Sequence, residues 1–184
     1  MKTVITAIVV VLALIIAGYF FYAGMMPWQQ QGAPLGVNFY ANGTQGISFE
    51  YPQTYILTER EVGNAERAHY AITLIHESDA QPRENSEGPP AVAIDIYENT
   101  TNQTLEQWLT TSESNRNLGS SALVERTVDG ADAVSYHWSG LYEGDTTAFL
   151  HNGSIVVVSV TYIAPEDEIR AVYVKILSSL DLVP

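Results

Sequence analysis

The chain has 184 residues, and its 8 Lys and Arg against 21 Asp and Glu give a formal net charge of −13 at pH 7. Such an acidic surface repels phosphate backbones, which argues against nucleic-acid binding. The chain contains no cysteine, so a lipoprotein anchor and disulfide bonds are both excluded.

The N-terminal stretch is the most informative part of the sequence. No charged side chain occurs between Lys2 and Glu50, and residues 4–26 are almost purely apolar. Crossing a bilayer takes about 20 apolar helical residues, because lipid offers no partners for backbone N–H and C=O groups. Residues 4–26 meet that length, and we predict a single-pass transmembrane anchor over residues 1–28.

The distribution of positive charge predicts the orientation of this anchor. Lys2 and the α-amino group lie on one side, and the next cation is Arg60. The positive-inside rule therefore places the N-terminus in the cytoplasm and the C-terminal domain outside the cell membrane. The alternative is a cleaved signal peptide, which has an apolar region of roughly 7–15 residues and a small-x-small cleavage site. Here the apolar run is longer and residues 19–22 are bulky, which favours an uncleaved anchor.

Behind the anchor, 7 basic and 21 acidic residues leave a net charge of −14. Residues 29–45 are rich in Gln, Gly and Asn, which predicts a flexible linker. Residues 46–184 are enough for one folded extracytoplasmic domain with a sizeable core. The chain has four N-x-S/T sequons, which matter only in a host that glycosylates them: Asn42, Asn99, Asn102 and Asn152.

Alternating apolar and polar residues predict the first four strands of the domain. These patterns cover residues 47–51, 55–62, 69–76 and 91–97. Residues 77–90 lie between the last two patterns and are rich in charge, Pro, Gly and Ser, with no apolar run. We predict a surface loop for them.

A helix is predicted next, over residues 104–114. Thr104 and Gln107 resemble a capping box, and the apolar residues that follow recur at i, i+3 and i+4. Two hairpins come after it, with Asp-Gly and Asn-Gly turns that supply the positive φ angles of a type I′ turn. Their strands span residues 123–128 with 131–139, and 145–150 with 154–162.

The second hairpin and the C-terminal segment predict the centre of the fold. Residues 155–158 are apolar on both alternating sets, so their strand is expected to be covered on both faces. From Pro165, an acidic turn over residues 166–168 precedes a sustained apolar stripe, which predicts a helix docked on the sheet. The order of elements indicates the α+β class, an antiparallel sheet covered by helices.

Three segments resemble PsbP-like domains. Residues 46–52, Gly-Ile-Ser-Phe-Glu-Tyr-Pro, resemble the opening motif of that family. Residues 104–109, Thr-Leu-Glu-Gln-Trp-Leu, and the closing Ile-Leu-Ser-Ser-Leu of residues 176–180 follow the same plan. The resemblance covers roughly residues 44–183 and implies an α/β/α sandwich with a central antiparallel sheet.

The resemblance implies less about function. Photosynthetic members of the family are extrinsic subunits that support a membrane complex and its calcium and chloride requirement. Bacterial relatives are mostly anchored or lipidated envelope proteins without an assigned activity. Lys2 and Lys175 are the only lysines, so no basic patch for docking on a photosystem is present.

The sequence carries no catalytic motif. Neither G-x-S-x-G nor H-E-x-x-H occurs, so we expect no enzyme activity and no cofactor. His137 and His151 would become neighbours, able to hold a transition metal, if their strands pair across a turn at residues 141–144. The other interpretation is that these histidines are half-buried and hydrogen-bonded.

Acidic turns are the other candidate metal sites, since carboxylates are the ligands that calcium prefers. None of them has EF-hand spacing, so calcium would be held loosely, and turn formation or helix capping explains all three groups without it. These groups are Asp129 with Asp132, Glu143 with Asp145, and residues 166–168.

An aromatic group surrounds the second turn of the predicted sheet: Tyr136, Trp138 and Tyr142, together with Trp108. It would line a small groove or form part of the core. We expect Tyr136 and Trp138 in the core and Tyr142 at the surface.

We therefore predict a non-catalytic, membrane-anchored extracytoplasmic protein that binds or stabilises a partner membrane or envelope protein. The acidic face and residues 77–90 would be the contact surfaces. The alternative is a small-ligand or calcium-binding module with its site near residues 136–145. The candidate contact residues for either function are Tyr142, Glu143, Asp145, His137 and His151.

Overall fold

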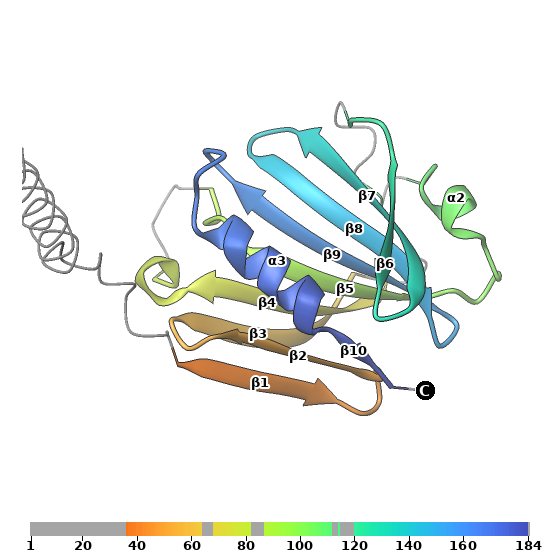
Figure 1. Cartoon of the computed structure of the whole chain (residues 1–184), viewed down its shortest axis with the longest axis horizontal. Helices are drawn as coiled ribbons and strands as arrows, with labels where there is room; N and C mark the ends of the chain where they lie inside the picture. The colour runs from red at the N-terminus through yellow and green to blue at the C-terminus, as the bar shows by residue number, and fades with distance from the viewer. Residues whose placement is uncertain (1–35, 64–67, 82–86, 112–113, 115–119, 184) are drawn as a thin grey trace, which may run out of the picture. The chain divides into compact units, whose positions relative to one another are not determined.

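The computed structural model describes residues 36–63, 68–81, 87–111, 114 and 120–183. The predicted anchor over residues 1–28 lies outside this part of the chain. None of the described helices is long and apolar enough to cross a membrane. The described elements follow one another along the chain (Figure 1) as β1 (Val37–Asn42), β2 (Ile47–Pro52), β3 (Tyr55–Val62), β4 (His69–His76), η2 (Glu77–Asp79), β5 (Val92–Glu98), α2 (Leu105–Trp108), β6 (Val124–Val128), β7 (Ala131–Ser139), β8 (Glu143–His151), β9 (Ser154–Tyr162), α3 (Ile169–Ser179) and β10 (Asp181–Leu182).

Seven strands form one antiparallel sheet in the order β3-β4-β5-β9-β8-β7-β6. They match the ranges that the apolar patterns predict to within two residues. β9 lies in the middle of the sheet, and the four residues 155–158 are at most 5 % exposed. The prediction that this strand is covered on both faces is therefore confirmed.

The hairpin turns have the backbone geometry that their sequences predict. Asp129 and Gly130 have φ angles of 45° and 81°, and Asn152 and Gly153 have 47° and 75°. A type I′ turn needs positive φ at both central residues, which Asn, Asp and Gly adopt most easily. The Asn152 side chain also donates to the Val183 carbonyl over 3.0 Å. This sequon residue therefore has a structural role of its own.

A second sheet joins β1, β2 and β10. The predicted linker over residues 29–45 is wrong for residues 37–42, which form β1 and pair with β2 along their whole length. Tyr40 points inward, with its ring centroid 4.9 Å from that of Phe49. One buried ring and a partner strand stabilise β1, and neither is visible as a pattern in so short a polar segment. The folded unit begins at Gly36.

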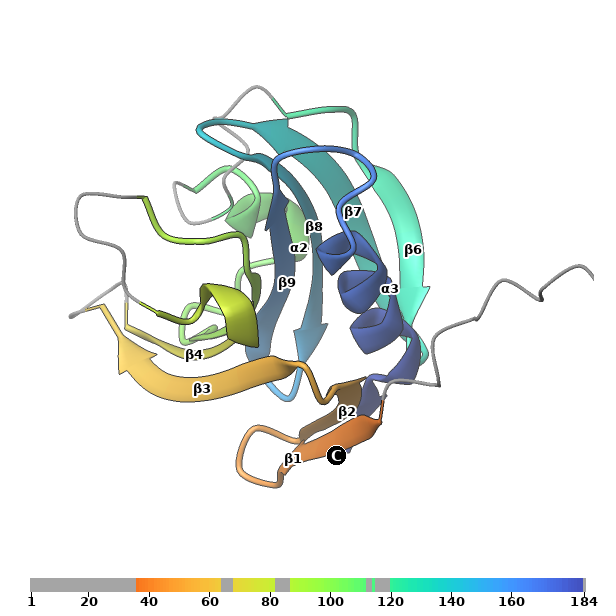
Figure 2. The same cartoon turned by 90° about the vertical axis from the view of Figure 1, so that its left-hand side faces the viewer.

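α3 covers one face of the seven-stranded sheet and contributes four buried side chains, Ile169, Val172, Tyr173 and Ile176. The Tyr173 hydroxyl lies 2.7 Å from Thr147 Oγ1 in β8, which adds a buried polar contact to this apolar interface. The small sheet lies beside the C-terminal end of α3 in both views (Figures 1 and 2). Lys175 of α3 pairs there with Glu50 of β2 over 2.8 Å.

The helix begins later than the sequence predicts, at Ile169 rather than at Pro165. The Asp167 carboxylate accepts hydrogen bonds from the N–H groups of Ile163 and Ala164, at 2.8 and 3.0 Å. These bonds close a separate turn before the helix. Asp167 therefore stabilises that turn, and residues 166–168 do not form the first turn of the helix.

α2 covers part of the opposite face of the sheet, and Thr104 and Gln107 form the predicted capping box. The helix ends at Trp108, so the predicted range of residues 104–114 is too long. Trp108 packs in a second buried cluster with Tyr136, Trp138 and Ile155. The described part of the chain is thus mostly antiparallel sheet with few helices, and the implied α/β/α sandwich has only this short helix described in its second helical layer.

Gly144 tests how tightly this second cluster is packed. It lies directly opposite Trp138 in the β7–β8 ladder, and a Cβ atom at Gly144 would lie 2.3 Å from the indole ring. We expect Gly144→Ala to lower the free energy of unfolding by about 1–3 kcal/mol, because the ring would have to leave its packed position. Urea denaturation followed by tryptophan fluorescence measures the change.

Gly43→Ala is the matched control, because a Cβ atom at Gly43 meets open space. Its free energy of unfolding should stay within about 0.5 kcal/mol of the parent protein. Equal stability of the two variants would contradict the close contact between Gly144 and Trp138.

Candidate functional site

Three of the predicted contact residues lie together where β7 turns into β8. His137 and Asp145 are partners in the β7–β8 ladder, with His137 Nδ1 3.1 Å from Asp145 Oδ1. His137 Nε2 lies 2.9 Å from Glu143 Oε2. Each ring nitrogen of His137 therefore faces a carboxylate. The Ser139 hydroxyl donates to Glu143 over 3.0 Å, so it is directed at a carboxylate and not at the imidazole.

Two residues that the sequence did not single out complete this polar cluster. Arg170 of α3 donates from Nε and Nη2 to Asp145 Oδ2, at 3.2 and 3.0 Å, and its guanidinium carbon lies 4.5 Å from the centroid of the Tyr162 ring. The Tyr162 hydroxyl lies 3.2 Å from His137 Nδ1. Burial raises the pKa of Tyr162, and the negative charge of Asp145 raises it further. The hydrogen bond to Asp145 raises the pKa of Arg170 above its ordinary value.

The polar cluster joins β7, β8, β9 and α3, and its members bind one another. The Asp145 carboxylate contacts three other side chains of the cluster: His137, Tyr162 and Arg170. Arg170 directs its remaining donor, Nη1, to the carbonyl of Pro165 over 2.7 Å. Such a set of contacts is typical of groups that hold structural elements together, because little donor or acceptor capacity is left for a ligand.

The pair of His137 and His151 that the sequence allowed does not form, because His151 lies at the other end of β8. The turn at residues 140–142 sets the register, which places Asp145 and not His151 opposite His137. His151 Nε2 is instead 2.9 Å from the carbonyl oxygen of Gly46. Gly46 has a φ of 65°, and a Cβ atom there would lie 2.6 Å from the carbonyl oxygen of Val183. His151 therefore helps to hold the first turn and the C-terminal strand together.

Tyr136 and Trp138 lie in the core as predicted, whereas Tyr142 is only partly exposed. Tyr136 and Trp138 are 3 % and 7 % exposed. Trp138 Nε1 donates to Thr146 over 2.9 Å, and the Tyr136 hydroxyl donates to the carbonyl of Ser114. Tyr142 is half-buried, and its hydroxyl donates to the carbonyl of Gly88 over 2.6 Å. That bond connects the start of β8 to the end of the predicted loop.

The three acidic turns are explained by contacts within the chain. Asp129 accepts from the Leu182 N–H over 2.8 Å, Asp167 accepts two backbone N–H groups, and Glu143 and Asp145 face His137. Over the described residues, no group of three or more His, Asp or Glu side chains is placed to hold a metal ion. The calcium alternative gains no support from these positions.

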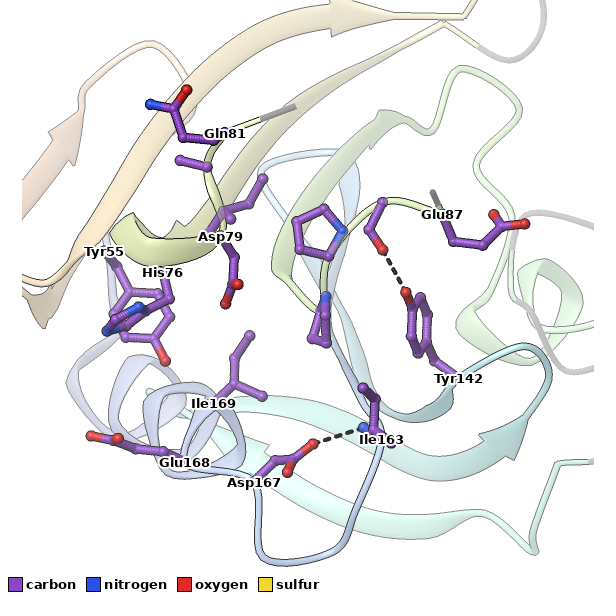
Figure 3. Close-up of a pocket in the computed structure, with 15 residues that line it drawn as sticks. Tyr55, His76, Asp79, Gln81, Glu87, Tyr142, Ile163, Asp167, Glu168 and Ile169 are labelled. Carbon is purple, nitrogen blue, oxygen red and sulfur yellow. Dashed lines mark hydrogen bonds between the residues drawn. The ribbon is translucent and has the colours of Figure 1, made fainter. Parts of the chain in front are cut away.

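A hollow of about 800 Å³, which we call the groove, opens at the end of the sheet next to Tyr142. Figure 3 shows its lining, with Asp79 and Ile169 pointing into the space and Gln81 and Glu87 pointing away from it. The segments that bound it are the start of β3, the end of β4 with η2, residues 87–90, the turn between β7 and β8, and residues 163–169 between β9 and the start of α3. Its lining residues are Tyr55, Ile75, His76, Asp79, Ala80, Gln81, Glu87, Gly88, Pro89, Pro90, Tyr142, Ile163, Asp167, Glu168 and Ile169.

Negative charge and apolar surface lie side by side in the groove. The backbone bonds from Ala164 and Ile163 hold the pKa of Asp167 below its usual value, so this carboxylate stays charged at neutral pH. Burial, followed by the charges of Glu168 and Asp79, raises the pKa of the Tyr55 phenol to about 12. Ile163 is 70 % exposed, as is Leu141, the neighbour of Tyr142 in the chain.

Of the predicted contact residues, only Tyr142 lines the groove, and the prediction missed most of its walls. Residues 77–90 were predicted as a contact surface, and the structure places residues 79–81 and 87–90 of this segment in the lining. The acidic turn at residues 166–168 was a second signal. Neither signal showed that the ends of β3, β4 and β9 meet at one place, because this depends on strand order.

Comparison with known proteins supports the fold alone. No family model matches the chain, and no curated protein matches it. The solution structure of cyanobacterial PsbP (CyanoP) from Synechocystis sp. PCC 6803 is similar, with a TM-score of 0.53 and 12 % sequence identity over 83 % of this chain and 95 % of that one. The chain therefore has a PsbP-like fold, as its sequence motifs imply. The Saccharomyces cerevisiae Ran-binding protein Mog1p matches with a TM-score of 0.47 and 14 % identity over 81 % and 96 % of the two chains, which is too weak to support a conclusion.

A double-mutant cycle tests the structural role of the polar cluster. We expect Asp145→Asn and Arg170→Gln each to lower the free energy of unfolding by about 1–3 kcal/mol, because each change removes hydrogen bonds to a charged group. The double variant should lose less than the sum, with a coupling energy of about 0.5–3 kcal/mol. Urea denaturation of the four proteins gives all the values.

The exposed pair Lys175–Glu50 is the matched control, since its side chains are 38 % and 48 % exposed. The same cycle on Lys175→Gln and Glu50→Gln should give a coupling energy of at most about 1 kcal/mol. Additive effects of Asp145→Asn and Arg170→Gln would show that the cluster does not fasten α3 to the sheet.

Proposed function

We propose that this chain is a membrane-anchored, non-catalytic extracytoplasmic protein that binds a partner membrane or envelope protein through the groove. The observation that carries the proposal is the hollow of about 800 Å³, whose lining includes Ile163, a large apolar side chain that is 70 % exposed. Exposed apolar surface in a hollow is typical of sites where another molecule is bound.

The side chains of the polar cluster and of the groove favour binding over catalysis. In the polar cluster both ring nitrogens of His137 face carboxylates, and the nearby Ser139 hydroxyl donates to Glu143. Nucleophilic catalysis needs a base that contacts the nucleophile, and this arrangement does not provide one. The groove offers carboxylates, aromatic rings and aliphatic side chains, which suit the recognition of a protein surface.

The revised start of the domain bears on where the partner lies. An anchor that ends at residue 28 leaves only residues 29–36 before β1. Eight extended residues span at most roughly 26–29 Å. A domain on so short a tether meets partners at or close to the membrane surface, and this supports a membrane or envelope protein as the partner.

The anchor and its orientation have a direct test. We expect the mature protein to retain residues 1–26, because an apolar run of this length is inserted and not cleaved. Intact-mass measurement of the purified protein detects this, and protease added to intact cells should digest the C-terminal domain. A mature chain that starts near Met25, or a domain that is digested only after the cells are opened, would contradict the proposal.

Partner binding is tested by crosslinking in native membranes, followed by mass spectrometry. We expect Ile163→Glu to reduce the yield of a stoichiometric crosslinked partner by more than about fivefold, the effect of losing about 1 kcal/mol at a central contact. The added charge faces the apolar part of the site, where a partner would have to desolvate it.

Val174→Glu is the control for this experiment, because Val174 is 61 % exposed on α3 and does not line the groove. Both positions are at the surface, so neither variant should change stability by more than about 0.5 kcal/mol. Retention of the partner by both variants would place the binding surface elsewhere.

A further inference from the structure

The groove has a charge that restricts what it can bind. Asp79, Asp167 and Glu168 contribute carboxylates to its lining from two separate segments, η2 and the turn before α3. Among the described lining residues there is no Lys or Arg. Arg170 lies next to Ile169 in the chain, but its guanidinium is bonded to Asp145 and to the carbonyl of Pro165. The hollow is therefore negative and its nearest described arginine is already engaged.

The Tyr55 phenol reports on the electrostatic potential inside the hollow. Its ring is buried, and the charges of Glu168 and Asp79 add to the effect of burial in raising its pKa to about 12. Burial is the larger cause and disfavours any charge, whereas the contribution of the two carboxylates disfavours a phenolate and favours a cation. The same carboxylates disfavour phosphate or carboxylate ligands. They do so although the groove lies at the start of α3, and the N-terminal end of a helix by itself attracts anions.

The rest of the groove lining, beside these carboxylates, is apolar and offers few backbone donors. Pro89 and Pro90 line it, and a proline has no N–H group to pair with an added strand. The Gly88 carbonyl already accepts from Tyr142. Recognition on this side depends on side-chain contact with Ile163 and the two prolines. The volume of about 800 Å³ accommodates a few side chains rather than a folded domain.

We infer that the groove binds an extended segment of the partner protein that carries a Lys or Arg side chain next to an aliphatic one. The basic group lies among the carboxylates of Asp79, Asp167 and Glu168, and the aliphatic side chain packs on Ile163 and the prolines. This inference rests on the proposed function and names the chemistry of the partner at the same site. Such a segment contacts both the carboxylates and the apolar residues of the lining. A simple cation would use only the carboxylates, and an apolar ligand only the apolar residues.

The test uses the full-length protein in non-ionic detergent and short fluorescein-labelled peptides whose binding is followed by fluorescence anisotropy. One peptide has a Lys-Leu-Lys core between Gly-Ser flanks; in two others Gln replaces each Lys, or Ser replaces Leu. We expect only the first to bind well, with weak affinity that falls when the salt is raised about tenfold, a change that shortens the Debye length about threefold.

The variant Asp79→Asn/Glu168→Gln should bind the Lys-Leu-Lys peptide about fivefold more weakly or worse, since two attractive charges are lost. The control Glu61→Gln/Glu98→Gln removes the same net charge at exposed positions near the far ends of β3 and β5. It should bind within about twofold of the parent protein. This comparison separates the groove from the general acidity of the chain.

Several outcomes would overturn the inference. Equal weakening by the two double variants, or binding of spermidine as tight as that of the peptide, would show attraction by charge alone. If no peptide binds while Ile163→Glu still abolishes the crosslinked partner, the proposed function stands and this inference fails.

Discussion

The structure depends on the burial of both faces of one central strand. β9 has apolar side chains on each side, with Val156 and Val158 facing α3 and Ile155 and Val157 facing α2. Each buried aliphatic side chain contributes about 1.5–3 kcal/mol, so neither face can remain in water. α3 covers one face with its apolar stripe, and α2 with Trp108 covers part of the other. The position of α3 on the sheet follows from this requirement.

Docking of α3 also creates the groove. The first residue of the helix, Ile169, is buried against the sheet, and this places Asp167 and Glu168 at the strand ends. Tyr55 and His76 are partners in the β3–β4 ladder at the same end, and Glu143 and Tyr162 are partners in the β8–β9 ladder. The hollow is therefore a consequence of where α3 begins on the sheet, and its lining comes from segments far apart in the sequence.

The polar cluster and the groove are neighbours with different physical roles. In the cluster, Asp145 is partly buried and is satisfied by three side chains, so its charge contributes to holding α3. In the groove, Glu168 is exposed, and the apolar Ile163 in the same lining is 70 % exposed. A charge that is already paired favours structure, whereas exposed charge next to exposed apolar surface favours binding. This difference in hydrogen bonding is the reason to prefer the groove over the polar cluster as the binding site.

Strand and turn positions in this protein are local properties, and the sequence alone determined them. The apolar patterns placed eight strands correctly, and Asp129-Gly130 and Asn152-Gly153 specified two of the turns because only a few residue types adopt positive φ. The PsbP-like plan was visible for the same reason. Only the tertiary structure showed β1, the groove, and the strand register that separates His137 from His151. Each of these depends on which distant segments of the chain meet, and the periodicity of a sequence carries no information about that.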